Sequence, residues 1–267
     1  MIVVQTAIFA GILALLLGVL LAIFRKVFHV ETDVLVAVIR ETLPGANCGA
    51  CGFPGCDGFA QAVAAKEADP GKCTVSDAAS SQKRASLVGG EADPKSYIAI
   101  IACQGTKDLA LAKGDYTGLK TCRGAKISSA GTKACAWGCM GFGDCVKVCK
   151  FDAIRMGENG LPVIDAGKCK GCKVCVGECP QAIIRIIEKG TKGGFALCNN
   201  RNPIKPMVKK TCKTGCGKCG ACAKACPSGA LEMVNGLPVI DYTKCQSCGT
   251  CVDKCPQKVL VLMGKAS

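Results

Sequence analysis

The longest stretch of the chain without a charged side chain lies at its beginning. Residues 2–24 are almost entirely apolar, and Arg25 and Lys26 follow them directly. A helix needs about 20 such residues to cross the hydrocarbon core of a bilayer, so this stretch predicts a transmembrane anchor over residues 1–26. A cleaved signal peptide would need a basic start, a shorter apolar core and a small-residue cleavage site, and no such pattern is clear here.

The charges beside the anchor predict its orientation. No Lys or Arg precedes the apolar stretch, whereas two basic residues follow it at once. Basic residues next to a membrane helix usually remain in the cytoplasm. We therefore expect a single-pass protein of the bacterial cell membrane whose other domains are cytoplasmic.

Three short stretches after the anchor have the apolar spacing of amphipathic helices. They run over residues 33–43, from about 57 to 68, and from about 77 to 88, and each is followed by Gly or by Pro and Gly. Gly and Pro are typical helix terminators. The pattern predicts a small helical domain over residues 27–92.

A long internal repeat occupies the second half of the chain. The sequence Asn-Gly-Leu-Pro-Val-Ile-Asp occurs at residues 159–165 and again at residues 235–241, and cysteines on both sides of it recur at an offset of 76 or 77 residues. A repeat of this kind indicates a duplicated structural unit. We predict an α+β fold with two similar domains at residues 131–190 and 209–267, preceded by a cysteine-containing lead-in at 93–130 and joined by a linker at 191–208.

The composition indicates that these domains depend on metal. The 267 residues include 24 Cys but only 3 Tyr, 1 Trp and 8 Phe. Small domains with few large core side chains usually need disulfides or bound metal for stability. Because cytoplasmic thiols stay reduced, clustered cysteines in this chain favour metal binding.

The spacing of the cysteines identifies the metal. Three stretches have the pattern Cys-x2-Cys-x2-Cys-x3-Cys-Pro, and they begin at Cys169, Cys216 and Cys245. One tight loop of this kind provides three ligands to a [4Fe–4S] cluster, and the fourth Cys reaches the other cluster of a pair. Structural zinc sites usually take two separated Cys pairs around one ion, which fits this pattern poorly. The two repeated domains are therefore predicted to be ferredoxin-like, with two [4Fe–4S] clusters each.

The first motif of the first copy departs from this spacing. It reads Cys-x3-Cys-x5-Cys-x3-Cys from Cys135 to Cys149, and Phe142 stands where the second copy has Cys219. Cys135 is therefore expected to be the replacement ligand. Lys150 also stands where the other motifs have Pro.

The crossed arrangement predicts four ligand sets in the two copies. In the first copy they are Cys149 with Cys169, Cys172 and Cys175, and Cys135, Cys139 and Cys145 with Cys179. In the second copy they are Cys226 with Cys245, Cys248 and Cys251, and Cys216, Cys219 and Cys222 with Cys255.

The helical domain carries a fifth set of four cysteines. The pattern Cys48-x2-Cys51-x4-Cys56-x16-Cys73 is surrounded by glycines, which permit the close backbone approach that a cluster requires. We predict one further [4Fe–4S] cluster there.

Four cysteines remain after these five clusters, namely Cys103, Cys122, Cys198 and Cys212. They are either four buried thiols or the ligands of a sixth cluster. Cys103 and Cys198 each follow a short apolar strand candidate. Cys212 matches Cys135 at the repeat offset, so it could instead compete with Cys219 as a ligand.

The net charge of +14 becomes much smaller once the negative charge of the bound clusters is included. A cluster with four thiolates carries about −2 when oxidised, so five clusters leave about +4 and six leave about +2. The sequence also lacks the interleaved aromatic residues that stack on bases. Nucleic acid is therefore not an expected partner.

The order of these features resembles the B subunit of the bacterial Rnf complexes, in the longer form found in anaerobes. The resemblance rests on the anchor, the motif from Cys48 to Cys73, the run from Cys135 to Cys145 and the second cluster pair, and it covers nearly the whole chain. It implies a subunit of a bacterial membrane complex that moves electrons from reduced ferredoxin to NAD⁺ and couples this to Na⁺ or H⁺ transport.

The resemblance also implies the partners of the chain: other subunits of the membrane complex, and soluble ferredoxin as the electron donor. Lysines near the cluster loops are candidates for steering an acidic ferredoxin, among them Lys147, Lys150, Lys170, Lys173, Lys218 and Lys224. The sequence has no G-x-G-x-x-G or P-loop motif, so no complete active site is expected on this chain alone.

Two other functions remain open at this stage. One is a membrane-anchored polyferredoxin that feeds a hydrogenase or another reductase without pumping ions. The other is a cluster-based redox sensor or assembly scaffold, for which the sequence shows no effector module.

Overall fold

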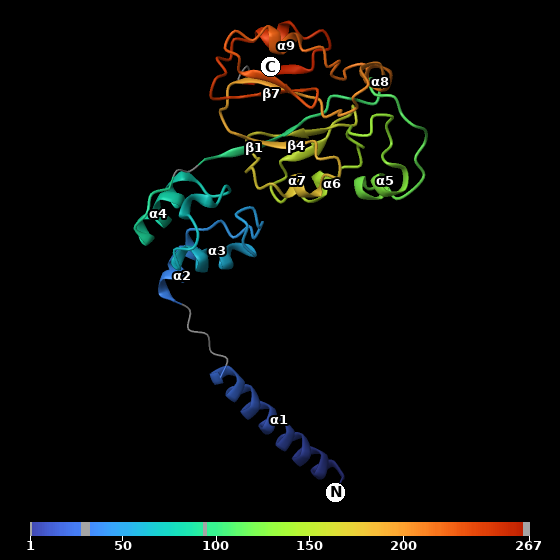
Figure 1. Ribbon diagram of the computed structural model, residues 1–267. Coiled ribbons are helices and arrows are strands. Elements are labelled where there is room, and N and C mark those ends of the chain that lie inside the picture. Colours follow the sequence, from blue (N-terminus) through green and yellow to red (C-terminus); the bar gives the residue numbers. More distant parts are fainter. Residues whose placement is uncertain (1, 28–32, 93–94, 264–267) are drawn as a thin grey trace.

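The computed structural model describes residues 2–27, 33–92 and 95–263 of the chain. The helix α1 spans Ile2–Val27 and has a mean hydropathy of 2.9 over Val4–Val27. None of that stretch is buried against the remaining chain, and Arg25 and Lys26 lie in its last turn. The described residues thus contain one helix that is long and apolar enough to cross a membrane, and it lies at one end of the molecule (Figure 1).

A small helical unit follows α1. Asp33 and Asp77 begin two of its helices, because each carboxylate accepts a hydrogen bond from a backbone N–H of the first turn. Ile39, Phe59 and Val63 form a core that is almost completely buried. The elements are α2 (Val34–Glu41), α3 (Gly55–Ala64), the 3₁₀ helix η1 (Pro70–Lys72) and α4 (Ala78–Val88).

Arg84 holds this helical unit together. Its side chain is completely buried and donates hydrogen bonds to the carbonyl oxygens of Pro70 and Thr42, both at 3.0 Å, and to Ser81 Oγ at 2.9 Å. Burial lowers the pKa of Arg84, while the nearby thiols of Cys73 and Cys56 oppose that shift. One cation thus ties α4 to η1 and to the end of α2, close to the cysteine loop.

Each repeat folds into a module with a two-stranded hairpin and two short helices. The second hairpin turns at Asn235 and Gly236, whose φ values are +51° and +75°, as a two-residue type I′ turn requires. The elements are α6 (Asp144–Lys147), β2 (Ile154–Met156), β3 (Pro162–Ile164) and α7 (Val174–Glu178) in module 1, and α9 (Ala221–Lys224), β6 (Leu231–Val234), β7 (Leu237–Ile240) and α10 (Thr250–Asp253) in module 2.

A strand from outside each expected domain completes each module. In module 1, β1 (Tyr97–Ile101) pairs antiparallel with β4 (Ile184–Glu188). In module 2, β5 (Gly193–Ala196) pairs in the same way with β8 (Leu260–Met263). The lead-in and the linker therefore each contribute a strand to the module that follows them.

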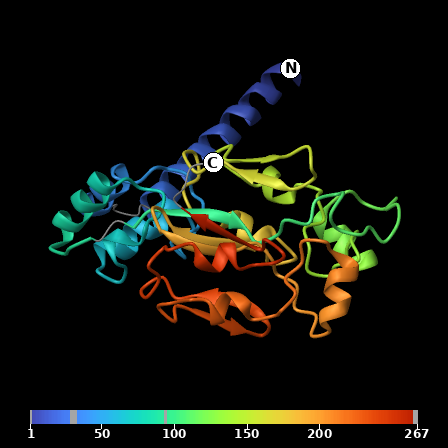
Figure 2. The ribbon, with the colours of Figure 1, turned by 90° about the horizontal axis from the view of Figure 1, so that it is seen from above.

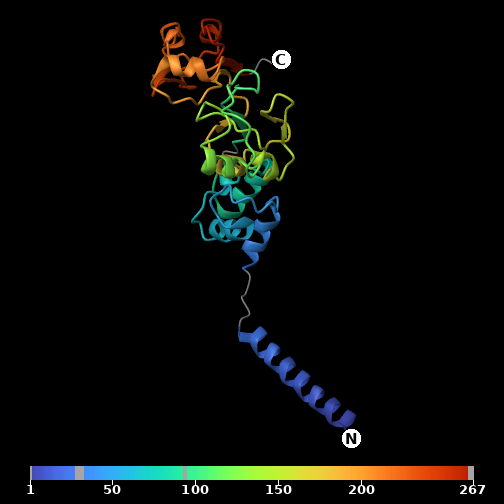
Figure 3. The same ribbon diagram turned by 90° about the vertical axis from the view of Figure 1, so that its right-hand side faces the viewer.

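Two further helices come from the lead-in and the linker. These are α5 (Cys122–Ser129) and α8 (Lys205–Thr211), and they lie on the opposite side of the strands from the helical unit (Figures 1 and 2). The lead-in meets the end of α8 through a bridge between Ala110 and Cys212. The helical unit, module 1 and module 2 are stacked in chain order away from α1 (Figure 3).

Candidate metal centres

Four cavities in the two modules are each surrounded by four cysteines. Each encloses about 340 to 400 Å³ of space when its open mouth is included. Their similar size and identical donor set indicate the same kind of occupant. The four sets are Cys122, Cys139, Cys145 and Cys179; Cys216, Cys219, Cys222 and Cys255; Cys226, Cys245, Cys248 and Cys251; and Cys103, Cys135, Cys198 and Cys212.

The eight other cysteines form two groups of four. Burial raises the pKa of Cys175 to about 12, together with the neighbouring thiols of Cys172, Cys169 and Cys149. Burial also raises the pKa of Cys51, and the nearby thiols of Cys73 and Cys48 raise it further. Cys56 packs in the same core. All 24 cysteines thus lie in six groups of four.

The groups have the geometry of cluster sites rather than of single-ion sites. Within residues 2–27, 33–92 and 95–263, no three His, Cys, Asp or Glu side chains converge closely enough for one metal ion. The cysteines instead surround a cavity. Strand β5 leaves room for this, because a Cβ on Gly193 would lie 2.9 Å from Cys245 Sγ and one on Gly194 would lie 3.1 Å from Cys251 Sγ.

Backbone amides point at the sulfurs of both modules. The N–H of Ala153 donates to Cys149 Sγ at 3.4 Å, and the N–H of Val259 donates to Cys255 Sγ at 3.3 Å. In both modules the donor lies four residues after the cysteine, just where the chain leaves the motif. Such donors stabilise thiolates and the reduced state of an iron–sulfur cluster.

Burial opposes ionisation of the most deeply buried thiols. It raises the pKa of Cys139 and of Cys145 to about 12, because a thiolate is poorly solvated in such a site. Metal binding therefore has to displace the protons. A cluster that takes four thiolates into a protein cavity with amide donors fits these residues.

In module 1 and module 2, the fourth cysteine of each motif lies with the cysteines of the other motif of the module. Cys179 and Cys255 line the cavity of the preceding motif, while Cys149 and Cys226 lie with the following one. Cys219 lines a cavity with Cys216, Cys222 and Cys255, whereas Cys212 lies elsewhere. Cys212 and Cys219 thus lie in different cysteine groups.

The structure differs from the sequence-based expectation in the place of Cys135. Spacing predicts this residue beside Cys139, Cys145 and Cys179, but Cys122 occupies that position. Burial raises the pKa of Cys145 to about 12, helped by the thiols of Cys139, Cys122 and Cys179. Burial raises the pKa of Cys135 to about 11, with contributions from Cys103, Cys198 and Cys212. Cys122 and Cys135 have thus exchanged the groups that spacing predicts for them.

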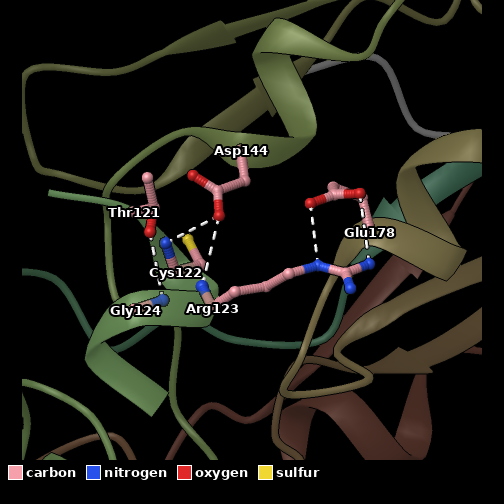
Figure 4. Close-up of polar contacts among 6 residues, drawn as sticks. All are labelled: Thr121, Cys122, Arg123, Gly124, Asp144 and Glu178. Carbon is pink, nitrogen blue, oxygen red and sulfur yellow. Dashed lines mark hydrogen bonds and ion pairs between the residues drawn. The ribbon is translucent and has the colours of Figure 1, made fainter. Parts of the chain in front are cut away.

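Two contacts hold Cys122 at its cavity. Asp144 Oδ2 accepts hydrogen bonds from the backbone N–H groups of Cys122 and Arg123, at 2.7 and 3.3 Å. The Arg123 guanidinium pairs with Glu178 at 3.1 Å, next to the ligand Cys179. Figure 4 shows that the first turn of α5 is thereby attached to α6 and α7. The sequence signal for this arrangement is weak, because Cys122 belongs to none of the cysteine motifs.

The remaining group, which we call the junction site, consists of Cys103, Cys135, Cys198 and Cys212. Cys103 follows β1 and Cys198 follows β5, and the preceding residues Ala102 and Leu197 extend the two strand pairs in the same way. Cys212 ends α8. The four cysteines left over in the sequence, considered there as either buried thiols or a sixth ligand set, include Cys122 in place of Cys135, and those four are not brought together here.

Lys150 has a role that its place in the sequence does not predict. Its Nζ donates hydrogen bonds to the carbonyl oxygens of Ala46 and Asn47, at 3.1 and 3.3 Å. It therefore attaches the loop before Cys48 to module 1, and the Cys48 thiol contributes to a raised pKa of Cys172.

Comparison with known proteins supports the cluster chemistry. A family model described as an Fe-S cluster matches residues 43–75, one described as a 4Fe-4S binding domain matches residues 162–185, and one described as a 4Fe-4S dicluster domain matches residues 215–259. The chain therefore binds [4Fe–4S] clusters. Eight of its cysteines, including all four of the junction site, lie outside these three segments.

Three relatives align with most of the chain. One from Acetobacterium woodii, the B subunit of a Na⁺-translocating ferredoxin:NAD⁺ oxidoreductase complex, is 41% identical over 88% of this chain and 70% of its own length. The proton-translocating counterpart from Clostridium ljungdahlii is 39% identical over 86% and 81%. The B subunit of an ion-translocating oxidoreductase complex from Methanosarcina acetivorans is 35% identical over 89% of both chains.

Proposed function

Because the chain belongs to the family of B subunits of ion-translocating ferredoxin:NAD⁺ oxidoreductases, the Rnf complexes, we propose that it is the electron-relay subunit of such a complex. It carries electrons from reduced ferredoxin toward NAD⁺, and the complex couples this transfer to Na⁺ or H⁺ translocation. The observation that carries the proposal is the division of all 24 cysteines into six groups of four within a chain of this family.

Six [4Fe–4S] clusters are proposed, one for each group. Each occupied site supplies a one-electron carrier. The protein residues position four thiolates around each site, direct amide N–H groups at several of the sulfurs and restrict access of water. The proposed ligands are the six cysteine sets described above, with Cys122 completing the atypical site of module 1 and Cys135 belonging to the junction site.

The contacts between sites support one continuous path. The Lys150 contact places the site of Cys48 beside that of Cys172. Cys175 of that site contributes to the raised pKa of Cys145, so the two sites of module 1 are neighbours. The junction site follows, and the two sites of module 2 lie beyond it (Figure 3).

The direction of flow is proposed from exposure and from the membrane anchor. Cys219 and Cys248 are the exposed cysteines, and both belong to module 2, at the end of the stack away from α1 (Figure 1). Ferredoxin is therefore proposed to donate at module 2. Electrons then leave through the helical unit toward membrane subunits, with all cluster domains on the cytoplasmic side, as Arg25 and Lys26 predict.

Inside-out membrane vesicles test this function. Ferredoxin-dependent reduction of NAD⁺ is measured with and without an imposed Na⁺ or H⁺ gradient, in vesicles that contain the complete complex. An opposing gradient is expected to slow the reaction if this subunit serves an ion pump. A rate that is independent of either gradient would contradict ion coupling and favour a membrane-anchored polyferredoxin.

A further inference from the structure

The junction site takes its ligands from segments on both sides of the boundary between the modules. Cys103 and Cys135 precede or belong to module 1, while Cys198 and Cys212 lie in the segment that leads into module 2. The surrounding chain is interlocked, because Gln104 Nε2 donates to the carbonyl oxygen of Lys258 at 3.0 Å. The site thus takes cysteines from segments that pack in both modules.

A hydrogen bond connects the junction site to a ligand of each neighbouring site. The backbone N–H of Cys139, a member of the atypical site in module 1, donates to Cys103 Sγ at 3.4 Å. The backbone N–H of Cys216, a member of the first site in module 2, donates to Cys198 Sγ at 3.4 Å. The two contacts are equivalent in the two modules. In each of them a single hydrogen bond joins two neighbouring cysteine groups.

A buried amide completes the site. Asn200 is only 3% exposed, and its Nδ2 lies 3.4 Å from Cys135 Sγ. Its orientation is determined, because Oδ1 accepts a hydrogen bond from the N–H of Asn202 at 2.9 Å and so leaves the amide nitrogen facing the sulfur. Asn200 is thus a fixed donor aimed at a ligand of the junction site.

We propose that the junction site is the electron-transfer link between the two modules, and that Asn200 raises its reduction potential through the N–H···S hydrogen bond to Cys135. The proposal rests on the proposed function. No covalent bond forms or breaks, since one electron arrives from one module and one leaves to the other. Reduction adds negative charge, which a donor to the thiolate sulfur stabilises. Asn200 thus acts on the site through the sulfur of Cys135.

The first experiment compares Asn200→Leu with Asn199→Leu in the full chain, purified without oxygen. Asn199 is equally buried and lines the same cavity, so its replacement controls for the loss of a buried amide there, but its own amide donates to the Gln181 carbonyl oxygen rather than to sulfur. Redox titration followed by EPR is expected to show one cluster shifted downward in Asn200→Leu alone. Loss of the bond should change the reduced-to-oxidised ratio about tenfold at a given potential, which is about 59 mV for one electron. Unchanged potentials in Asn200→Leu would refute the tuning role.

The second experiment removes the junction site with the double variant Cys198→Ala and Cys212→Ala. Iron is expected to fall from about 24 to about 20 atoms per chain, as one four-iron cluster is lost. After rapid mixing with reduced ferredoxin, freeze-quenched EPR should show one module reduced as before and the other delayed at least tenfold. Circular dichroism identifies a variant that fails to fold. In that case Asn200→Leu is mixed in the same way and decides, because its retained but lower-potential cluster should delay the same module, by less than loss of the cluster would.

The outcomes separate this proposal from the proposed function. Both modules becoming reduced at the wild-type rate in the double variant would refute the link. Wild-type protein with about 20 iron atoms per chain, unchanged in the double variant, would show that the junction site holds no cluster. Neither result bears on the proposed function. That function would be refuted if vesicles with the intact complex showed no ferredoxin-dependent NAD⁺ reduction.

Discussion

At the scale of single residues, Cys122 and Cys135 determine how the clusters of module 1 are built. Cys122 lies at the first turn of α5 and joins Cys139, Cys145 and Cys179, whereas Cys135 faces the junction site. The two residues therefore lie in different cysteine groups although only 12 residues separate them in the sequence.

Serine variants distinguish these two positions. Cys122→Ser and Cys135→Ser are each expected to lose about four iron atoms per chain, because serine oxygen is a poor replacement for a thiolate ligand. EPR should then show different missing signals in the two variants. If both variants lost the same signal, the two cysteines would ligate one cluster, and the assignment of Cys135 to the junction site would be wrong.

Lys150 is the second residue whose role can be tested directly. Lys150→Met removes two hydrogen bonds to the loop before Cys48, each worth about 1.5 to 3 kcal/mol because the donor is charged; exposure to solvent reduces that value. We expect faster amide hydrogen exchange across residues 46–53. Lys147→Met, an exposed position on α6, is the control and should leave this loop unchanged. Equal exchange in both variants would contradict the docking role.

At the scale of elements, α5 shows how a short helix can present a ligand. Thr121 Oγ1 accepts a hydrogen bond from the N–H of Gly124 at 3.0 Å. In the same turn, the Asp144 carboxylate accepts hydrogen bonds from the N–H groups of Cys122 and Arg123. The N-terminal partial charge of a helix attracts a carboxylate. The cap and the carboxylate together set the position of Cys122 (Figure 4).

Substitution of Asp144 tests this arrangement. Asp144→Asn keeps the size of the side chain but weakens two charge-assisted hydrogen bonds, at a cost of about 1.5 to 3 kcal/mol. Iron is expected to leave one cluster faster when a chelator is added. Asp152→Asn is a matched control, because Asp152 is exposed and its φ of +48° suits asparagine. Iron loss at the wild-type rate in Asp144→Asn would show that α5 is held by other contacts.

The strands β1 and β5 complete the modules at the same scale. Ala99 in β1 donates its backbone N–H to Cys169 Sγ at 3.4 Å, and Gly194 in β5 passes close to Cys251. Each strand thus covers the cluster of the second motif in its module. The segments before module 1 and between the two modules thus contribute to the cysteine sites and also connect the parts of the chain.

At the scale of the whole molecule, the stack of helical unit, module 1 and module 2 separates the membrane end from the exposed cysteines (Figure 3). Lys224 is exposed on α9, and Lys218 lies partly exposed in the loop that carries Cys219. We propose these two lysines as the docking residues for an acidic ferredoxin on module 2. Lys170 and Lys173 are exposed on module 1 and offer a comparison.

Charge reversal tests where ferredoxin docks. Lys218→Glu with Lys224→Glu should slow reduction by ferredoxin about tenfold or more at low salt, because steering raises association rates by about 10-fold to 10³-fold. Lys170→Glu with Lys173→Glu should have a smaller effect. Raising the ionic strength from about 0.01 to 0.15 M shortens the screening length from about 30 to 8 Å and should remove the difference. A salt-independent rate would contradict electrostatic docking.

The sequence alone determined the features that depend on neighbouring residues. An uncharged stretch of sufficient length specifies a membrane helix, and a Cys-x2-Cys-x2-Cys loop brings three sulfurs to one cluster because the chain between them is too short to do otherwise. The matches at residues 43–75, 162–185 and 215–259 confirm this cluster chemistry. The motifs starting at Cys169, Cys216 and Cys245 could therefore be recognised without a structure.

Only the tertiary structure decided the ligands that come from distant segments. Cys103 and Cys198 reach the junction site because β1 and β5 pair with the last strands of their modules, and Cys122 reaches module 1 because Asp144 fixes the start of α5. Spacing carries no information about such contacts, since a long flexible connection can close at nearly equal entropic cost around many partners. The packing of strands and helices selects one partner, and so assigns Cys135 to the junction site and Cys122 to module 1.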